Sequence, residues 1–244
     1  MTEYGEGTVA IVTGGSRGIG RAVVEEMLNR FYTVWFCSRS QAGVDRALSD
    51  LRPIHKDRVI GRAVDVGDQE QVDAFVAEVD DACERIDILV NNAGFGLFAP
   101  VDEISGDEWR SLMGANLDGP FYFTRAVAPI MKRRSEGFIL NVASLAGRNA
   151  FAGGSAYNAA KFGMVGFSEA SMLDLRGDGI RVSAILPGSV NTDFFDTAGQ
   201  VGGTPAEQML QAEDVAKTII DLLSYPSRAL PSRVEIRPSL KRKN

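Results

Sequence analysis

Residues 13–20 read Thr-Gly-Gly-Ser-Arg-Gly-Ile-Gly and join two stretches of different periodicity. Residues 8–12 before them are mostly apolar and β-forming, whereas apolar side chains recur at helical spacing over residues 19–31 after them. The glycines therefore lie at a turn that leads from a strand into a helix. The free N–H groups of such a helix start, together with the positive end of its dipole, suit a pyrophosphate group.

The glycines of this turn have different expected roles. Gly14 can adopt backbone angles that a Cβ forbids, Gly18 lets a ligand approach the backbone, and Gly20 lets the helix pack close to the sheet. A glycine-rich turn by itself is also compatible with a plain loop. The choice between a nucleotide site and a loop therefore depends on the rest of the chain.

The composition indicates one large α/β domain over residues 1–244. Hydrophobic residues make up 45% of the chain and charged residues 24%, an ordinary balance for a soluble protein. The net charge of −6 argues against general nucleic-acid binding, and no apolar run is long enough to span a bilayer. Because residues 1–7 are acidic and few, we expect no signal peptide there.

The cysteines and the single histidine do not have the spacing of a metal site. Cys37 and Cys83 each continue an apolar pattern, so both are predicted to be small buried groups. Together with the absence of a signal peptide, they suggest a reducing, cytoplasmic setting. His55 lies in a polar stretch, which favours a surface loop.

Strand-like and helix-like stretches alternate along the whole chain. Strands are expected over residues 9–13, 33–37, 59–64, 86–90, 137–142, 181–186 and 234–236. Helices are expected over residues 18–30, 43–51, 69–84, 107–132, 156–176 and 212–223. Because short loops join them, this alternation predicts a Rossmann-like, doubly wound parallel sheet of about seven strands with helices on both faces.

Basic residues stand where a dinucleotide fold recognises the adenosine ribose. The second strand leads into Ser38-Arg39 and lacks the acidic residue that would bind the ribose hydroxyls. Arg17 adds a second guanidinium, and two cations without a carboxylate favour a 2′-phosphate. The sequence therefore predicts NADP(H) in preference to NAD(H). The alternative is that Arg17 and Arg39 are solvated surface charges.

Polar amides follow the fourth strand at its carboxyl end, where open α/β sheets bind ligands. Asn-Asn-Ala-Gly at residues 91–94 has this place, with the apolar Phe95, Leu97 and Phe98 after it close to the ligand edge, and an Asx turn is its alternative role. Asp65, at the end of the third strand, is by itself only a turn or cap residue. Asn116 lies inside a predicted helix with glycines on either side, which favours a local break that presents it to the site.

Three residues form a candidate catalytic group. Ser144 follows a predicted strand, and Tyr157 and Lys161 are four apart on a predicted helix, so their side chains project from one face. An ammonium beside a phenol favours the phenolate and lowers the Tyr157 pKa, which makes Tyr157 an acid–base group near neutral pH. A Tyr-x-x-x-Lys pair alone is more often a surface pair, but here it follows the glycine turn, Asn-Asn-Ala-Gly and Ser144.

In this order, the motifs resemble the short-chain dehydrogenase/reductase family over nearly the whole chain. The resemblance implies that Tyr157 transfers the substrate proton and that Ser144 positions the substrate oxygen. It also implies that Lys161 tunes Tyr157 and holds the nicotinamide ribose, while Asn116 keeps a water in the proton relay. Thr192 closes a Pro-Gly-x-Val-x-Thr stretch and is implied to bind the nicotinamide carboxamide. The expected cofactor-binding set is Gly14, Ser16, Arg17, Gly18, Ile19, Gly20, Ser38, Arg39, Asp65, Val66, Asn92, Ala93, Gly94, Tyr157, Lys161, Pro187, Gly188, Val190 and Thr192.

The predicted function is an NADP(H)-dependent oxidoreductase that transfers a hydride between the nicotinamide and a carbonyl or alcohol. One alternative is a β-ketoacyl-(acyl carrier protein) reductase that docks an acidic carrier on basic residues 132–134 or on Arg176. Another is a protein that senses NADP(H) without turnover, against which the complete group of Asn116, Ser144, Tyr157 and Lys161 argues.

The resemblance places a substrate lid over residues 193–210. Its glycines suggest mobility and its phenylalanines suggest an apolar pocket wall, so we expect an apolar small-molecule substrate. The fifth and sixth predicted helices are apolar on more than one side, which calls for a second surface to bury them. In the resembled family that surface belongs to a partner subunit, so a homodimer or homotetramer is expected.

Overall fold

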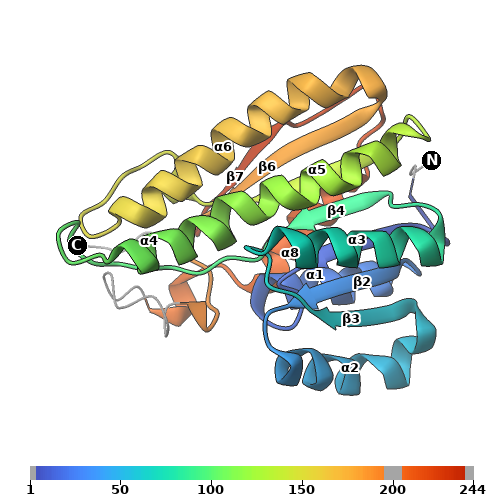
Figure 1. The fold of residues 1–244 in the computed structure, drawn as a ribbon, viewed down its shortest axis with the longest axis horizontal. Coiled ribbons are helices and arrows are strands. Elements are labelled where there is room, and N and C mark those ends of the chain that lie inside the picture. The colour runs from blue at the N-terminus through green and yellow to red at the C-terminus, as the bar shows by residue number, and fades with distance from the viewer. Residues whose placement is uncertain (1–3, 195–204, 240–244) are drawn as a thin grey trace.

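Seven parallel strands form a single sheet in the part of the chain that the structure, a computed structural model, describes: residues 4–194 and 205–239 (Figure 1). The strands are β1 (Val9–Thr13), β2 (Thr33–Ser38), β3 (Val59–Ala63), β4 (Ile88–Asn91), β5 (Gly137–Val142), β6 (Ile180–Pro187) and β7 (Arg233–Ile236). Their order across the sheet is β3-β2-β1-β4-β5-β6-β7. The predicted Rossmann-like, doubly wound sheet is thereby confirmed.

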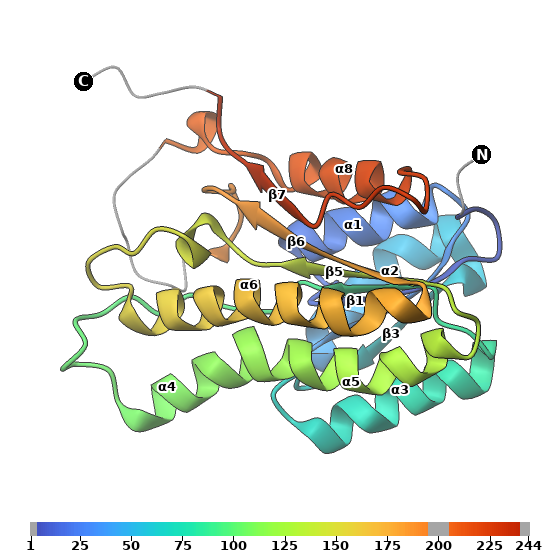
Figure 2. The ribbon, with the colours of Figure 1, turned by 90° about the horizontal axis from the view of Figure 1, so that it is seen from above.

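Helices cover both faces of this sheet. They are α1 (Gly18–Leu28), α2 (Gln41–His55), α3 (Gln69–Cys83), α4 (Gly106–Met113), α5 (Gly119–Lys132), α6 (Ser155–Leu175) and α8 (Ala212–Leu223). Figure 2 shows α1 and α8 on one side of the sheet and α3, α5 and α6 on the other. A parallel sheet needs this double cover because both of its faces are apolar.

Alternate residues of each strand enter different cores, because successive side chains of a strand point to opposite faces. On β1, Ala10 and Val12 pack with residues of α1, α2 and α8, whereas Val9 and Ile11 pack with residues of α3 and α5. All four are at most 5% exposed. This double burial explains why the strands read as continuous apolar runs.

The chain changes direction between β1 and β4, which are neighbours in the sheet although two strands separate them in sequence. At this point the hydroxyl of Thr13 accepts hydrogen bonds from the N–H groups of Asn92 and Ala93, each 2.9 Å long. The Asn92 side chain in turn donates to the Thr13 carbonyl at 3.0 Å. The glycine turn and Asn-Asn-Ala-Gly are thus joined where ligands bind in such sheets.

The predicted helix over residues 107–132 is interrupted. A π-helical turn, Gly114–Asp118, separates α4 from α5, and Asn116 lies within it at 1% exposure. The break expected at Asn116 is therefore present, and its form is a widened turn. Such turns are frequent at functional sites because the extra residue redirects a side chain.

His55 corrects the sequence-based interpretation. It was predicted in a surface loop, but α2 continues past residue 51 and His55 is its last residue, only 7% exposed. Pro53 lies within this helix, and the sequence around it gave no indication that the helix continues past residue 51. Burial lowers the pKa of His55, so this side chain favours its neutral form. Cys37 is buried as predicted, whereas Cys83 is only half-buried.

The predicted lid, residues 193–210, lies mostly outside the described residues. The structure describes its two ends, which are held together: the N–H of Asn191 donates to the Leu210 carbonyl at 2.8 Å, and the N–H of Leu210 donates to the Ser189 carbonyl at 3.0 Å. The described residues on the two sides of the predicted lid therefore lie side by side. Within the described ranges, none of the helices has the length and apolar character needed to cross a membrane.

Candidate active site

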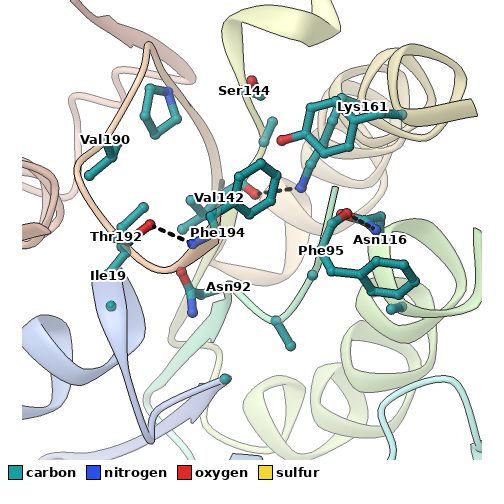
Figure 3. A pocket seen from close by; sticks show the side chains of 18 of the residues that line it. Ile19, Asn92, Phe95, Asn116, Val142, Ser144, Lys161, Val190, Thr192 and Phe194 are labelled. Atoms are coloured by element: carbon teal, nitrogen blue, oxygen red, sulfur yellow. Dashed lines mark hydrogen bonds between the residues drawn. The ribbon is translucent and has the colours of Figure 1, made fainter. Parts of the chain in front are cut away.

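A cavity of about 560 Å³ opens at the carboxyl ends of the strands (Figure 3). Residues that follow β1 to β6 line it, together with residues of α6 and of the π-helical turn. It brings together all the residues predicted for catalysis and cofactor binding except Gly20. Segments that are far apart in sequence therefore meet in one site.

Gly20 has a structural place instead. A Cβ on Gly20 would lie 2.2 Å from the Gly14 carbonyl oxygen and 2.5 Å from the side-chain nitrogen of Asn92. No side chain fits at such distances, so this glycine lets α1 approach the turn and the sheet. Gly20 thus allows the close packing of α1 next to the cavity and is not one of the residues that line it.

The glycine turn has the geometry of an anion cradle. Gly14 and Gly18 have φ values of +69° and +55°, which favour glycine. Arg17 stands at the N-cap position of α1 and makes no side-chain capping bond, so the first N–H groups of α1 are left for another acceptor. Together with the helix dipole, these donors fit a phosphate group. The residues present thus fit a dinucleotide.

Both predicted phosphate-binding arginines line the cavity. Arg39 is exposed, and Arg17 pairs with Asp193 at 3.7 Å while 65% of its side chain stays exposed. An exposed ion pair of this kind is weak, so Arg17 remains available to a stronger anion. Ser38 hydrogen-bonds Ser16 at 2.8 Å between the two hydroxyls, which ties the end of β2 to the glycine turn.

Asp65 combines its two proposed roles. One of its carboxylate oxygens accepts a hydrogen bond from the Gly67 N–H at 2.9 Å, so it stabilises the turn after β3. The same residue is exposed and lines the cavity. Turn formation, the simpler interpretation, is therefore present in the structure and compatible with a ligand contact.

Tyr157 and Lys161 lie one turn apart on α6, at 7% and 5% exposure. The Lys161 ammonium is 5.6 Å from the centre of the Tyr157 ring and donates to the Val142 carbonyl at 3.4 Å (Figure 3). The phenol of Tyr157 hydrogen-bonds the Ser144 hydroxyl. That hydroxyl also accepts from the Ala146 N–H at 3.1 Å, which fixes its position at the end of β5.

The titration of this group differs from the sequence-based expectation. Lys161 was expected to lower the pKa of Tyr157, but burial raises that pKa to about 12, and the bond to Ser144 only opposes the rise. Burial likewise lowers the pKa of Lys161 to about 8. In this enclosed site, loss of water penalises both charged forms. Tyr157 is therefore a protonated phenol at neutral pH.

Asn116 faces the same group from the π-helical turn. Its side-chain nitrogen donates to the carbonyls of Leu112 and Phe95, each at 3.0 Å (Figure 3). Its side-chain oxygen is buried and has no hydrogen-bond partner among the residues that the structure describes. A Cβ on Gly94 would lie 2.5 Å from that oxygen and 3.7 Å from the Lys161 ammonium. The two polar groups thus converge on the space beside Gly94.

Sequence reasoning missed Asn158, which holds the loop after Ser144. Its side-chain nitrogen donates to the carbonyls of Ala146 at 2.6 Å and Asn149 at 3.1 Å, and its oxygen accepts from the Phe151 N–H at 3.3 Å. Asn158 is 6% exposed. The available signal in the sequence was an amide side chain directly after Tyr157. The cavity residues of this loop, Asn149, Ala150 and Phe151, belong to no motif.

Residues 4–194 and 205–239 contain no group of three or more His, Cys, Asp or Glu side chains that is placed to hold a metal ion. The polar side chains about Tyr157 are those of Ser144, Asn116 and Lys161, whose hydroxyl, amide and ammonium groups suit hydrogen bonding and proton transfer.

Known proteins resemble this chain along most of its length. The family model described as short chain dehydrogenase matches residues 8–201. The chain is 32% identical to 3-oxoacyl-(acyl-carrier-protein) reductase FabG of Vibrio harveyi, over 90% of this chain and 91% of that protein. It is also 32% identical to 3alpha-hydroxysteroid dehydrogenase of Mediterraneibacter gnavus, over 88% of this chain and 89% of that protein. A metagenomic short-chain oxidoreductase in complex with NADP has a TM-score of 0.83 and 32% identity, with 97% of this chain and 99% of that chain covered.

Proposed function

The chain belongs to the short chain dehydrogenase family, and on that premise we propose that it is an NADPH-dependent reductase of a small, apolar ketone. Membership makes it an oxidoreductase and implies a nicotinamide cofactor. One observation carries the finer proposal: a protonated phenol, a hydroxyl and a buried ammonium meet in a cavity whose other end is a phosphate cradle. Two relatives of equal identity carry names with different substrates, so identity alone does not select one.

The residues at the glycine turn would hold the cofactor phosphates, and Thr192 and Lys161 would hold its nicotinamide end. When bound, the nicotinamide supplies the hydride. The two arginines at the adenosine end support NADPH over NADH, since each can bind phosphate oxygens in a forked geometry. The solved relative in complex with NADP is consistent with this preference.

Tyr157 would act as the acid of the reaction. Because burial raises its pKa to about 12, it carries its proton at neutral pH and can donate it to a carbonyl oxygen. Ser144, bonded to the same phenol, would add a second donor to that oxygen as negative charge develops there. The protonated phenol is the form that the reduction of a ketone requires. Lys161 and Asn116 converge beside Gly94, where one water would connect them to the proton supply.

The proposed reaction is tested by mixing the protein with NADPH and a panel of neutral ketones while following the NADPH absorbance. We expect NADPH consumption that depends on the ketone. If NADPH binds tightly and no ketone accelerates its oxidation, the protein is better described as one that senses the nucleotide.

Arg39→Ala tests the cofactor preference. We expect the Kd for NADPH to rise about tenfold or more, because a charge-assisted hydrogen bond is lost, with little change in the Kd for NADH. Fluorescence titration with both nucleotides measures the two constants. Arg46→Ala is the matched control, since Arg46 is an exposed residue of α2 outside the cavity lining. Equal losses for NADPH and NADH would contradict the assignment of Arg39 to the 2′-phosphate.

Acyl carrier protein as a partner is supported by the names of several relatives, among them the one from Vibrio harveyi. Two of the basic residues expected to dock the carrier form ion pairs at the surface, Lys132 with Asp178 at 2.7 Å and Arg133 with Asp80. Lys132 ends α5, about 20 Å along that helix from its start beside the cavity. Within one chain these cations therefore do not surround the cavity mouth.

We also propose that the chain assembles as a homodimer or homotetramer. Large apolar side chains are exposed on neighbouring helices: Trp109 of α4 is 41% exposed, and Phe121 of α5 and Phe162 of α6 are each 45% exposed. A self-complementary contact would bury all three. Sedimentation velocity at micromolar concentration measures the result, with a dimer or tetramer expected. A single species near the 26.3 kDa chain mass would contradict the proposal.

A further inference from the structure

We propose that three phenylalanines beside Tyr157 form an aromatic clamp that selects ketones carrying a flat aromatic ring close to the carbonyl. The aromatic clamp is Phe98, Phe151 and Phe194. This inference rests on the proposed ketone reduction and names the class of substrate for the same site. It distinguishes an aryl-bearing small molecule from a flexible acyl thioester.

The rings of the clamp come from three separate loops and meet at the reactive tyrosine. Phe98 is central: its ring centre lies 5.4 Å from that of Phe151, 5.5 Å from that of Tyr157 and 6.4 Å from that of Phe194. Phe194 also contacts Tyr157, with ring centres 5.7 Å apart. All three clamp residues line the cavity. Two rings of the clamp thus contact the tyrosine ring, and Phe98 links the third ring to them.

The clamp leaves apolar surface for a ligand. Phe98, Phe151 and Phe194 are only half-buried, although they are packed on a small core that contains Tyr157. In Figure 3 the side chain of Phe194 projects into the cavity from the segment that bears Thr192. A hydrogen bond of 3.4 Å from the Phe194 N–H to the Thr192 hydroxyl holds that segment. Ring surface that faces a cavity favours an apolar occupant.

The ring geometry favours a flat aromatic occupant over a saturated one. The clamp rings contact one another edge to face, with interplanar angles of 62° to 86° about Phe98. This arrangement presents the positive edges and negative faces of the rings in alternation, and an added aromatic ring can continue it. A saturated ring or chain gains only the burial of its area.

Most of the charged side chains that line the cavity lie at its adenosine end. The charged side chains that line it are Arg17, Arg39, Asp65, Lys161 and Asp193. The first three follow β1, β2 and β3, at the adenosine end, and Asp193 pairs with the first of them. Lys161 is buried and bonded to the Val142 carbonyl. Among the described residues that line the cavity, no formal charge is therefore left over to recognise a carboxylate or phosphate on the substrate, which favours a neutral ring.

Two ketones that differ only in the saturation of the ring test the clamp: 1-phenylpropan-2-one and 1-cyclohexylpropan-2-one. Neither ring is conjugated with the carbonyl, so the two carbonyls have similar reactivity. With NADPH we expect a higher kcat/KM for the phenyl compound, and Phe98→Leu or Phe151→Leu should lower the phenyl-to-cyclohexyl ratio about three- to tenfold by removing edge-to-face pairs. Phe31→Leu is the control, because Phe31 is 61% exposed and lies beyond the far end of α1.

A binding measurement separates failure of the clamp from failure of the reaction. In Tyr157→Phe loaded with NADPH the ring contacts remain, so calorimetry can compare the affinities of the two ketones without turnover. We expect tighter binding of the phenyl compound, and loss of that difference when Phe151→Leu is added. Equal affinities, or a ratio unchanged by the clamp substitutions, overturn the inference. So does a higher kcat/KM for an acetoacetyl thioester of N-acetylcysteamine, which would leave ketone reduction itself in place.

Discussion

Tyr157→Phe should lower kcat by about a thousandfold and leave the Kd for NADPH within about twofold, because only the proton donor is removed. The phenylalanine ring keeps its contacts with Phe98 and Phe194, so the shape of the cavity is preserved. Steady-state kinetics and fluorescence titration measure the two quantities. Tyr122→Phe is the matched control, since Tyr122 lies on α5 outside the cavity lining. Retention of most of the activity would mean that another group supplies the proton.

Lys161→Met should have two opposite effects. Activity and NADPH affinity should both fall, because Lys161 is proposed to serve the proton relay and the nicotinamide ribose. Stability at pH 7 should rise by up to about 3 kcal/mol, since burial lowers the pKa of this lysine from 10.5 to about 8 and the ammonium is held at that cost. Methionine keeps the length of the chain without the charge.

The effect of the buried Lys161 ammonium on the free energy of unfolding depends on pH, and the direction of this dependence follows from its lowered pKa. Between pH 8 and pH 10.5 the unfolded chain binds a proton at Lys161 that the folded chain has lost, so the free energy of unfolding should increase with pH across this window. Below pH 8 the destabilisation is fully present. In Lys161→Met this contribution to the increase should be absent. Urea denaturation of both proteins at pH 7 and pH 9.5 measures the difference.

Lys217→Met is the control for this experiment, because Lys217 lies on α8 with 74% of its side chain exposed and pairs only with Asp221 at 2.8 Å among the described residues. Its removal should change stability by less than about 1 kcal/mol at either pH. If Lys161→Met is less stable than the parent at pH 7, the buried ammonium stabilises the fold, and its placement in the site is not a cost to stability.

Much of the fold was predictable because its signals are local. The runs that became β1 and β5 are mostly apolar and are buried at every position, and both strands have the predicted bounds. The end of α2 is an exception with a tertiary cause. α2 extends through Pro53 to His55 although this stretch is polar, because Leu51 and His55 pack inward one turn apart. A polar composition therefore hid a helix that tertiary contacts stabilise.

The residues of the candidate site also fall into two groups, those that the sequence identified and those that it did not. Ser144, Tyr157 and Lys161 belong to motifs that occur along the chain in the expected order and at the expected spacing, so the sequence alone identified these three residues. Phe151 and Asn158 matter through contacts with other segments, which no spacing records. The raised pKa of Tyr157 was also beyond sequence reasoning, because it is caused by burial, and the extent of burial depends on the whole cavity.

Hydride transfer itself is the central claim, and an isotope follows it directly. The protein is incubated with 1-phenylpropan-2-one and NADPH that carries deuterium at the transferable C4 position, and the product is analysed by mass spectrometry. The account predicts the secondary alcohol with deuterium on the carbon that was the carbonyl, and no such product with Tyr157→Phe over the same time. Tight binding of the labelled NADPH without deuterated alcohol from this or any other ketone of the panel would contradict it.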